Sequence, residues 1–520
     1  LVFWAGAIYW LAPITLAGDI PSVLYLSVFW LVATLVVRAA MRRQMPMWIV
    51  LPVVWVALEY VRSLVIGGFP WFYLAHSQYQ CTGLIQISDL TGQYGVSVFV
   101  AMVSGTIIDA LAHPLFVRTG QGGRLTRKML TGAAACAVSV AGMLIYGSFR
   151  LHQSTTRPGP TIGAVQLAFP MSLDTSPVSP EEMFIKHLDR SGLLENAGCD
   201  LVVWPESMLG FPDFDPALWY SRDPDGIDPA TGRPWMPQQQ EIIRTYRASL
   251  GRLRGLLGDF GCPLLAGGTM THPTKIDPAN GKFLKTNSAL LFDRAPSGQV
   301  RRRRQYDKMH LVPFGETVPF REGWPWLYGL LRRFVPEQMP QLAAGQSPVR
   351  FEIPYTDADG AARSCRVAVP ICYEGVFARV CRKLVMANGQ KRAQLLVNLS
   401  NDGWFIFATA GWTHASTELD QHLVQYVFRA IENRVPVVRA VNTGISAHID
   451  SNGRIVQTVG REGRRKMVGG NLLAQTLVDE RVSLYSLVTD KVGEVFAWAI
   501  TAAAAMAALR LMAGRKKEKE

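Results

Sequence analysis

Long apolar runs occupy both ends of the chain, and a more polar pattern occupies the middle. A helix needs about 20 consecutive apolar residues to cross ~30 Å of hydrocarbon. Runs of this kind cover residues 1–17, 22–41, 48–66, 90–112, 129–148 and 492–513. The pattern therefore predicts a helical membrane bundle near the N-terminus and one further span near the C-terminus.

The middle of the chain alternates short β-rich runs with longer stretches typical of helices. The β-rich runs are 161–165, 200–203, 288–292, 365–369, 394–398 and 435–441, and the clearest helical stretches are 238–257 and 416–432. This alternation is typical of an α/β layered domain, in which functional residues lie where strands end. No repeat with a fixed period is present.

These patterns divide the chain into four parts. We expect a transmembrane bundle over 1–148, an α/β domain over 149–491, a C-terminal span over 492–513 and a basic tail over 514–520. Leu1 stands inside an apolar run with no basic segment before it, which is typical of neither a signal peptide nor a natural start. We therefore expect that an N-terminal portion is missing.

The distribution of basic residues predicts the orientation. Lys and Arg are disfavoured in short loops that must cross the membrane. The basic loops contain Arg38, Arg42 and Arg43; Arg118, Arg124, Arg127 and Lys128; and Arg515, Lys516, Lys517 and Lys519. The loop at 67–89 has no Lys or Arg, so this loop and the α/β domain are predicted to lie on the outer side.

Composition agrees with a membrane protein. The formal charge is +13, yet only 18% of the residues are charged and 49% are hydrophobic, whereas soluble domains average about 25% charged residues. Because much of the excess charge falls in the inner loops, we expect no nucleic-acid partner. Seven cysteines in 520 residues are too few for a disulfide scaffold. The six other than Cys372 show no metal spacing and no pairing that the sequence indicates.

Three predicted strand ends carry residues that could form a thioester. The apolar run at 200–203 continues through Trp204-Pro205 to Glu206, and Lys308 follows a basic run and precedes a loop with Pro and Gly. A third strand ends at Cys372. A thiol, a carboxylate and an ammonium group together can perform nucleophilic acyl chemistry. Each residue also has a structural alternative. Cys372 could be a small buried hydrophobe, Glu206 a solvated turn residue and Lys308 a surface charge.

The motifs around these residues resemble a known family. Trp-Pro-Glu206, Tyr-Asp-Lys308-Met-His-Leu-Val-Pro-Phe-Gly-Glu316 and Ile-Cys372-Tyr-Glu374 are similar to the Glu, Lys and Cys motifs of the nitrilase superfamily. Asn398-Leu-Ser-Asn-Asp-Gly-Trp404, Asn442-Thr-Gly-Ile-Ser-Ala447, Gly67-Gly-Phe-Pro-Trp71 and Ser77-Gln78 narrow the resemblance to the apolipoprotein N-acyltransferase family. The resemblance to this family implies an α-β-β-α sandwich on the outer face of a bundle of about eight spans.

The resemblance also implies a mechanism. An acyl chain would pass from a phospholipid to Cys372 and then to the α-amine of a diacylglyceryl-cysteine in an apolipoprotein. Glu206 would act as the general base, and Lys308 would stabilise the oxyanion. The protein would be a monomer in the bacterial inner membrane with its catalytic domain on the periplasmic side, and it would need no cofactor and no metal.

Further residues have roles that the sequence leaves open. Glu316 and Glu374 either orient Lys308 or form a buried ion pair, and Tyr373 and Trp404 either line an acyl pocket or belong to the core. The aromatic and basic stretch at 320–334, which includes Trp326 and Leu330, is predicted to lie at the membrane surface; the alternative is a lid that packs only on protein. Phe69, Trp71, Phe72 and Tyr73 are predicted at the outer headgroup level.

Two features depart from the family pattern. The link over 406–420 is longer than expected, and Gln166 stands near the position where the family has an Asn. Two rival functions also remain. A membrane-tethered nitrilase-type hydrolase would pass the acyl group to water. A transporter or scaffold would place paired ionisable residues along a membrane pathway, but Asp19, Glu59, Arg62 and Asp109 lie mostly near span ends.

Overall fold

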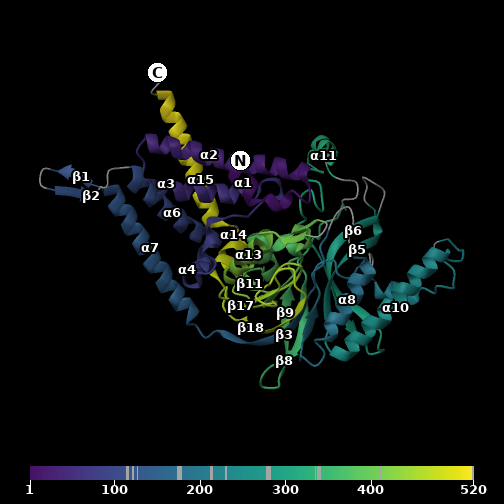
Figure 1. Ribbon diagram of the computed structural model, residues 1–520. Coiled ribbons are helices and arrows are strands. Elements are labelled where there is room, and N and C mark those ends of the chain that lie inside the picture. Colours follow the sequence, from purple (N-terminus) through teal and green to yellow (C-terminus); the bar gives the residue numbers. More distant parts are fainter. Residues whose placement is uncertain are drawn as a thin grey trace.

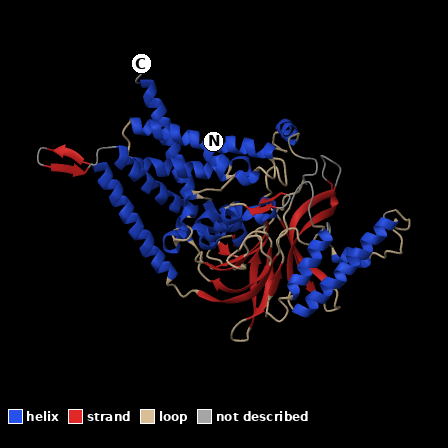
Figure 2. Ribbon diagram, viewed as in Figure 1, coloured by secondary structure: helices blue, strands red, loops and turns tan. Residues whose placement is uncertain are grey.

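The computed structural model describes all residues except 113–115, 120–121, 126, 172–177, 211–214, 229–230, 277–282, 322, 334, 336–340, 410–411, 493 and 518–520. Figure 1 shows a group of long helices beside a domain built from two sheets. Figure 2 shows that the strands gather almost entirely in this domain, with helices on its outer side.

Five long helices form the bundle. They are α2 (Leu16–Arg42), α3 (Met47–Arg62), α6 (Gln93–Ala112), α7 (Arg127–Leu151) and α15 (Val495–Lys517). The stretches Gly18–Arg42, Gln93–Ala112 and Met129–Leu151 are long and apolar enough to cross a membrane, and Val495–Ala507 is a shorter apolar stretch. The predicted spans at 22–41, 90–112, 129–148 and 492–513 correspond to α2, α6, α7 and α15. Among the basic loop residues, the side chains of Arg118, Arg124, Arg127 and Lys128 and those of 515–519 lie outside the described residues.

The predicted span at 1–17 is wrong. This stretch forms the short helices α1 (Val2–Ala7) and η1 (Tyr9–Leu11), separated by Ile8 in a non-helical conformation. Trp4, Ile8 and Trp10 are buried, whereas Leu1, Val2 and Phe3 are exposed. Trp10 packs edge-on against Phe405, with ring centroids 5.2 Å apart. Part of the apolar pattern in this stretch therefore results from packing against the α/β domain and not from a membrane span.

The predicted span at 48–66 is shorter than expected, because α3 ends at Arg62. Its first turn is capped from a neighbouring helix. Asp109 of α6 accepts hydrogen bonds from the backbone N–H groups of Met47 (3.0 Å) and Trp48 (3.1 Å). A carboxylate at a helix N-terminus satisfies free N–H groups and complements the helix dipole. Asp109 is thus a helix cap and not part of a transport pathway.

The α/β domain contains two six-stranded sheets. The first has the order β18-β3-β4-β5-β6-β7, and the second has the order β17-β16-β15-β12-β9-β8. The first comprises β3 (Thr156–Gln166), β4 (Leu201–Val203), β5 (Leu264–Ile276), β6 (Phe283–Arg294), β7 (Val300–Asp307) and β18 (Gly470–Asp479). The second comprises β8 (Arg350–Thr356), β9 (Ala362–Ala368), β12 (Leu395–Asn401), β15 (Val437–Asn442), β16 (Ala447–Ile449) and β17 (Ile455–Thr458).

The sheets stack face to face with helices outside them. Successive residues of β4 point to opposite faces: Leu201 and Val203 join the core that includes Val367 and Leu396 of the second sheet. Val202 joins a separate core with Phe184 of α8 (Pro180–Gly192) and Leu250 of α10 (Pro237–Phe260). On the other side lie α12 (Ala378–Val385) and α13 (Glu418–Asn433). This is the predicted α-β-β-α sandwich, and the predicted strands and helices are confirmed.

Shorter elements connect these parts. They are η2 (Val65–Gly67), η3 (Leu74–Gln78), α4 (Thr82–Ile85), α5 (Ser88–Thr91), β1 (Phe116–Thr119), β2 (Gly122–Leu125), α9 (Pro216–Ser221), α11 (Pro325–Arg332), η4 (Cys372–Val376), β10 (Met386–Ala387), β11 (Gln390–Lys391), η5 (Asp402–Phe405), β13 (Ile406–Thr409), β14 (Trp412–Ala415) and α14 (Leu484–Val492). The long link at 406–420 is therefore a β-hairpin followed by the start of α13. Tyr9 of η1 stacks on Phe407 of this hairpin at 5.5 Å.

Buried ion pairs join the bundle to the sandwich. Asp89 of α5 pairs with Arg150 at the end of α7 (2.7 Å) and accepts a hydrogen bond from Nε of Arg434, which follows α13 (2.9 Å). Glu432 of α13 accepts a hydrogen bond from the backbone N–H of Gln93, the first residue of α6 (2.9 Å). These contacts fix the sandwich against one end of the bundle.

Candidate active site

The three candidate residues follow strands of both sheets. Glu206 follows β4 and Lys308 follows β7, both in the first sheet, whereas Cys372 follows β9 in the second. Lys308 and Glu206 are in direct contact: Lys308 Nζ donates to Glu206 Oε1 at 3.2 Å. Both side chains are buried. The sandwich thus brings strand ends of both sheets to one place between them.

Lys308 is held between two carboxylates. Its Nζ also donates to Glu316 Oε1 at 2.9 Å, and Glu316 Oε2 accepts the backbone N–H of Val312 at 2.9 Å. Burial alone would lower the pKa of Lys308, but the charges of Glu206 and Glu316 outweigh it and raise this pKa above its usual value. Lys308 therefore carries a fixed positive charge, and its contact with Glu316 is compatible with both sequence-based alternatives, orientation of Lys308 and a buried ion pair.

Two further groups hold Glu206 in place. The side-chain amide of Asn287 donates to Glu206 Oε1 (2.6 Å) and to Glu316 Oε1 (2.8 Å). The backbone N–H of Asn401 donates to Glu206 Oε2 at 3.0 Å. Sequence reasoning missed Asn287. The available signal was the polar triplet Thr286-Asn287-Ser288 inside the otherwise apolar and fully buried part of β6.

Cys372 stands at a strained turn beside β12. Ile371 forms a parallel bridge with Leu399, which sets Cys372 next to Ser400. Cys372 has a φ of 47°, in the left-handed region that non-glycine residues rarely adopt. Its carbonyl oxygen accepts a hydrogen bond from the hydroxyl of Tyr426 at 3.2 Å. The turn lifts the thiol out of the strand, and the residue is only half-buried.

The surroundings of Cys372 favour the neutral thiol at rest. Burial and the negative charge of Glu206 raise its pKa well above the usual value; the charge of Lys308 lowers this pKa, and the charge of Asp402 raises it. Glu206 and Lys308 therefore both act on this sulfur. Because the thiol is neutral at rest, a nearby base must remove its proton when it reacts.

Glu374 connects the Lys308 and Cys372 segments. Its Oε1 accepts the hydroxyl of Tyr306 (2.8 Å) and the backbone N–H groups of Met309 (2.7 Å) and His310 (3.1 Å). Its Oε2 accepts the backbone N–H of Ile371 (2.8 Å). Burial raises the pKa of Glu374 to about 7. Its hydrogen bonds go to the chain on either side of the site rather than to Lys308.

The aromatic candidates lie around the site. The Tyr373 ring stacks on Trp71 in the segment that follows α3 (5.7 Å between centroids) and on His310 (5.6 Å), and its hydroxyl donates to the carbonyl of Gly68. Trp404 is half-buried in η5. Tyr373 therefore connects the turn at Cys372 to the segment that follows α3 of the bundle.

The candidates on α11 lie apart from the triad. This helix has no buried residue, and Trp326 and Leu330 are 72% and 45% exposed. Figure 1 shows α11 at the level of α1 and α2, on the bundle side of the sheets. Its apolar residues thus face outward at the end of the molecule where the membrane helices lie.

An apolar cavity of about 250 Å³ opens between the bundle helices. Trp4, Trp30, Trp55, Leu58 and Phe72 are among its lining residues, together with Glu59 and Arg62. Arg62 donates to the carbonyl of Trp71 at 2.7 Å, and Trp71 in turn stacks on Tyr373. Trp71 and Tyr373 therefore lie between this cavity and Cys372.

The unexpected Gln166 has a defined structural role. It is fully buried at the end of β3, its Nε2 donates to the carbonyl of Val468 (2.8 Å), and its Oε1 accepts the backbone N–H of Ser446 (2.8 Å). Gln166 thereby joins segments of both sheets. All of the described cysteines are free thiols, and among them Cys199 and Cys262 are neighbours.

Comparison with known proteins gives two family matches. Residues 161–470 match the model described as carbon-nitrogen hydrolase, and residues 1–106 match the model described as the apolipoprotein N-acyltransferase N-terminal domain. A protein from Geobacter metallireducens named apolipoprotein N-acyltransferase is 29% identical over 98% of this chain and 84% of its own length. A protein of the same name from Rhodopirellula baltica is 28% identical over 86% of this chain and 75% of its own length.

Solved structures were also compared. An amidase from Nesterenkonia sp. AN1, in a form modified by acrylamide at its active-site cysteine, is 15% identical with a TM-score of 0.37 and covers 65% of this chain and 98% of its own. The family model that spans the α/β domain matches more than half of the chain. The chain therefore belongs to the carbon-nitrogen hydrolase family.

Proposed function

We propose that the protein transfers an acyl chain from a membrane phospholipid, through a thioester on Cys372, to the N-terminal amine of diacylglyceryl-cysteine in apolipoproteins. The observation that carries the proposal is the buried Lys308, held by Glu206 and Glu316 beside a cysteine at a strained turn. The relatives' name and the spanning helices support a lipoprotein acceptor and a lipid donor.

In the first half-reaction Glu206 removes the proton from the Cys372 thiol while the sulfur attacks the ester carbonyl carbon of the phospholipid. The resulting oxyanion is stabilised by the ammonium of Lys308 together with a backbone N–H beside Cys372. When the carbon–oxygen ester bond breaks, the departing lysophospholipid oxygen takes the proton back from Glu206. Cys372 is left as a thioester, and the charge of the pocket is unchanged.

In the second half-reaction the α-amine of the acceptor attacks the thioester carbonyl carbon. The amine nitrogen loses a proton to Glu206, the carbon–sulfur bond breaks, and the departing sulfur takes that proton from Glu206. The products are the amide and the neutral thiol, which is the resting state that the raised pKa of Cys372 favours. Lys308 stabilises the second oxyanion in the same way as the first.

The competing function is hydrolysis, in which water replaces the amine. A phospholipid with an isotope-labelled acyl chain, incubated in detergent with a diacylglyceryl-cysteine peptide, distinguishes the two. We expect most of the label on the peptide amine, with free fatty acid as a minor product. Release of the label only as free fatty acid, in the presence of a saturating peptide concentration, would favour the hydrolase and reject the transferase.

The arrangement of helices supports a membrane topology with the catalytic domain on one side and the basic helix ends on the other. We propose a bundle over 1–148, a catalytic domain over 149–491, a span over 492–513 and a tail over 514–520, with the catalytic domain on the periplasmic side of the inner membrane. The support is that α2 and α15 end in basic residues at 42–43 and 515–517, whereas α6 begins at the sandwich through the contact of Gln93 with Glu432. We also propose that the protein acts as a monomer.

We propose that α11 inserts into the membrane surface and that the apolar cavity holds part of a lipid chain. Replacing both Trp326 and Leu330 by Asn is expected to lower acyl transfer at limiting vesicle concentration by about 10²-fold or more, because burial of each side chain in lipid contributes about 1.5–3 kcal/mol and each step of about 1.4 kcal/mol is a factor of ten. Transfer from a short-chain, water-soluble ester should change less than twofold.

The matched control is Ile242→Asn on α10, which is also an exposed apolar residue (50%) but lies on the helical layer away from the bundle. It should leave transfer from vesicles unchanged. Normal vesicle use by the Trp326/Leu330 variant would show that α11 is a lid that packs only on protein.

A further inference from the structure

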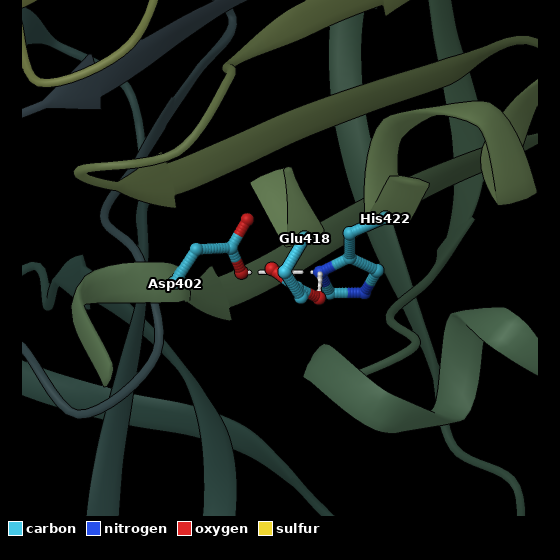
Figure 3. Close-up of side chains that lie close together, drawn as sticks. All are labelled: Asp402, Glu418 and His422. Carbon is cyan, nitrogen blue, oxygen red and sulfur yellow. Dashed lines mark hydrogen bonds and ion pairs between the residues drawn. The ribbon is translucent and has the colours of Figure 1, made fainter. Parts of the chain in front are cut away.

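Beside the proposed triad lies a buried cluster of three ionisable residues that the mechanism above does not use. Figure 3 shows Asp402, Glu418 and His422 with their polar atoms turned toward one another. His422 Nδ1 lies 3.1 Å from Asp402 Oδ1 and 3.7 Å from Glu418 Oε1. None of the three residues is more than 1% exposed. Glu418 comes from the end of the long link at 406–420.

The geometry fixes where protons sit in this cluster. Asp402 Oδ1 already accepts the Ser400 hydroxyl at 2.7 Å, and an ionised carboxylate can only accept, so His422 carries its hydrogen on Nδ1. His422 Nε2 is buried and has no hydrogen-bond partner among the described residues. A second proton there would place a positive charge on a buried ring whose new N–H donor has no acceptor, and an unpaired buried charge costs far more than an unpaired neutral group. His422 is therefore the neutral Nδ1–H tautomer.

Charge balance then places one further proton on Glu418. The buried cation facing the cluster is Arg439 of β15, whose Nη2 lies 3.6 Å from Asp402 Oδ2. One guanidinium balances one carboxylate, so an ionised Glu418 would add an uncompensated buried charge. Glu418 Oε2 has no hydrogen-bond partner among the described residues. Burial and the charge of Asp402 raise the pKa of Glu418 well above its usual value.

A metal ion fits this cluster less well than a proton. The ligand atoms are close enough for a small divalent cation. However, such an ion would lie against the buried guanidinium of Arg439, and Asp402 Oδ1 already accepts a hydrogen bond from Ser400. A single proton gives the cluster a net charge of zero with Arg439, whereas a divalent cation would leave a buried excess of positive charge.

We propose that Glu418 is a neutral, protonated carboxylic acid. Within this cluster Asp402 is then the one residue that places a negative charge near the Cys372 sulfur. The connection to the nucleophile is Ser400, which stands beside Cys372 and donates its hydroxyl hydrogen to Asp402. When Cys372 loses its proton to Glu206, that hydroxyl hydrogen rotates from Asp402 toward the sulfur, and the Nδ1–H of His422 still satisfies Asp402. No covalent bond breaks in this step.

The inference rests on the proposed role of Cys372 as the nucleophile, and Glu418 acts through Asp402 and Ser400 as a positioning residue. An ionised Glu418 would add a second negative charge beside Asp402 and would make the thiolate harder to form. The charged and titratable groups that face Glu418 are Asp402 of η5, Arg439 of β15 and, on its own helix, Asp420 and His422. Asp420 is ion-paired with Arg465 (2.9 Å) and Lys466 (2.7 Å).

The test uses the variant Glu418→Gln, which has the shape of the protonated acid, in the full-length protein in detergent. The rate at which iodoacetamide alkylates Cys372 is measured by peptide mass spectrometry from about pH 6 to about pH 10. Near pH 7 the variant should react within about twofold of the wild type. Towards the alkaline end of this range Glu418 can ionise in the wild type but not in the variant, so the variant should become faster than the wild type by up to about tenfold. A purely structural role would not change the shape of this profile.

Two controls accompany the profile. Asp402→Asn removes the negative charge that faces Cys372, so alkylation should be about tenfold faster across the whole range. Glu182→Gln changes an exposed glutamate in the first turn of α8, which pairs with Lys186, and it should change nothing. Infrared difference spectra between wild type and variant should contain a protonated carboxyl band for Glu418 and none for Glu182.

Three outcomes would overturn the inference. Tenfold faster alkylation by Glu418→Gln already near pH 7 would mean that Glu418 is ionised at rest, and parallel profiles with no carboxyl band would mean that it does not act on the sulfur. One equivalent of a transition metal in the purified wild type, lost in Glu418→Gln, would make the cluster a metal site. The infrared band does not depend on reaction at Cys372, so it separates failure of this inference from failure of the proposed function.

Discussion

Lys308→Met should reduce acyl transfer by about 10²- to 10³-fold, because it removes the main charge that stabilises both oxyanions. Methionine is similar in length to lysine but carries no charge, so Glu206 and Glu316 would lose their shared ion-pair partner at 3.2 and 2.9 Å. Two buried carboxylates left without this cation also disfavour ionisation of the Cys372 thiol. The measurement is single-turnover acylation of Cys372 by a labelled phospholipid.

Stability must be separated from chemistry in this variant. Removing one partner of a buried ion pair costs about 3–5 kcal/mol, so thermal unfolding is measured in parallel. Lys186→Met is the matched control, because Lys186 pairs with Glu182 on the surface of α8 and is about half exposed. A folded Lys308→Met protein that acylates Cys372 at the wild-type rate would reject the role given to Lys308.

Glu206→Gln should reduce transfer by about 10²- to 10⁴-fold, the range typical of a lost general base. The amide keeps an oxygen that can accept from Asn287 and Lys308, but its NH₂ group would face the backbone N–H of Asn401, which donates to Oε2 at 3.0 Å. The loss should be smallest at high pH, where the Cys372 thiol ionises without help. The raised pKa of that thiol determines the sign of this dependence.

The control for this variant is Glu352→Gln, an exposed glutamate on β8. It should leave the rate and its pH dependence unchanged. If Glu206→Gln lost the same factor at all pH values, Glu206 would be a positioning residue for Lys308 and not the base.

Local pattern was enough to predict the strands and the residues at their ends. Each run over 161–165, 200–203 and 365–369 is mostly apolar and is followed by polar or turn residues, so the position and the end of each strand can be predicted from neighbouring residues alone. The contact between Glu206 and Lys308 follows because their strands belong to one sheet, and the family resemblance supplied the pairing with Cys372.

The parts that sequence did not predict depend on distant partners. The run at 1–17 has the composition of a span, but its residues Tyr9 and Trp10 pack on Phe407 and Phe405, about 400 positions away. In the sequence Asn287 is an ordinary polar residue, and its role becomes visible only in the fold, where β6 places it between two carboxylates. The sequence shows Glu418 only as an acid at a helix N-terminus, and it is burial beside Asp402 in the folded chain that makes its charge costly.

The central claim is that Cys372 carries the acyl chain between donor and acceptor. The most direct test is the intact mass of the Cys372 peptide after the full-length protein is incubated with phospholipid and no acceptor, followed by addition of a diacylglyceryl-cysteine peptide. The mass should increase by one acyl chain in the wild type but not in Cys372→Ser, and the adduct should disappear as the peptide amine becomes acylated. An active protein with no adduct on Cys372, or an adduct that the acceptor does not discharge, would contradict the account.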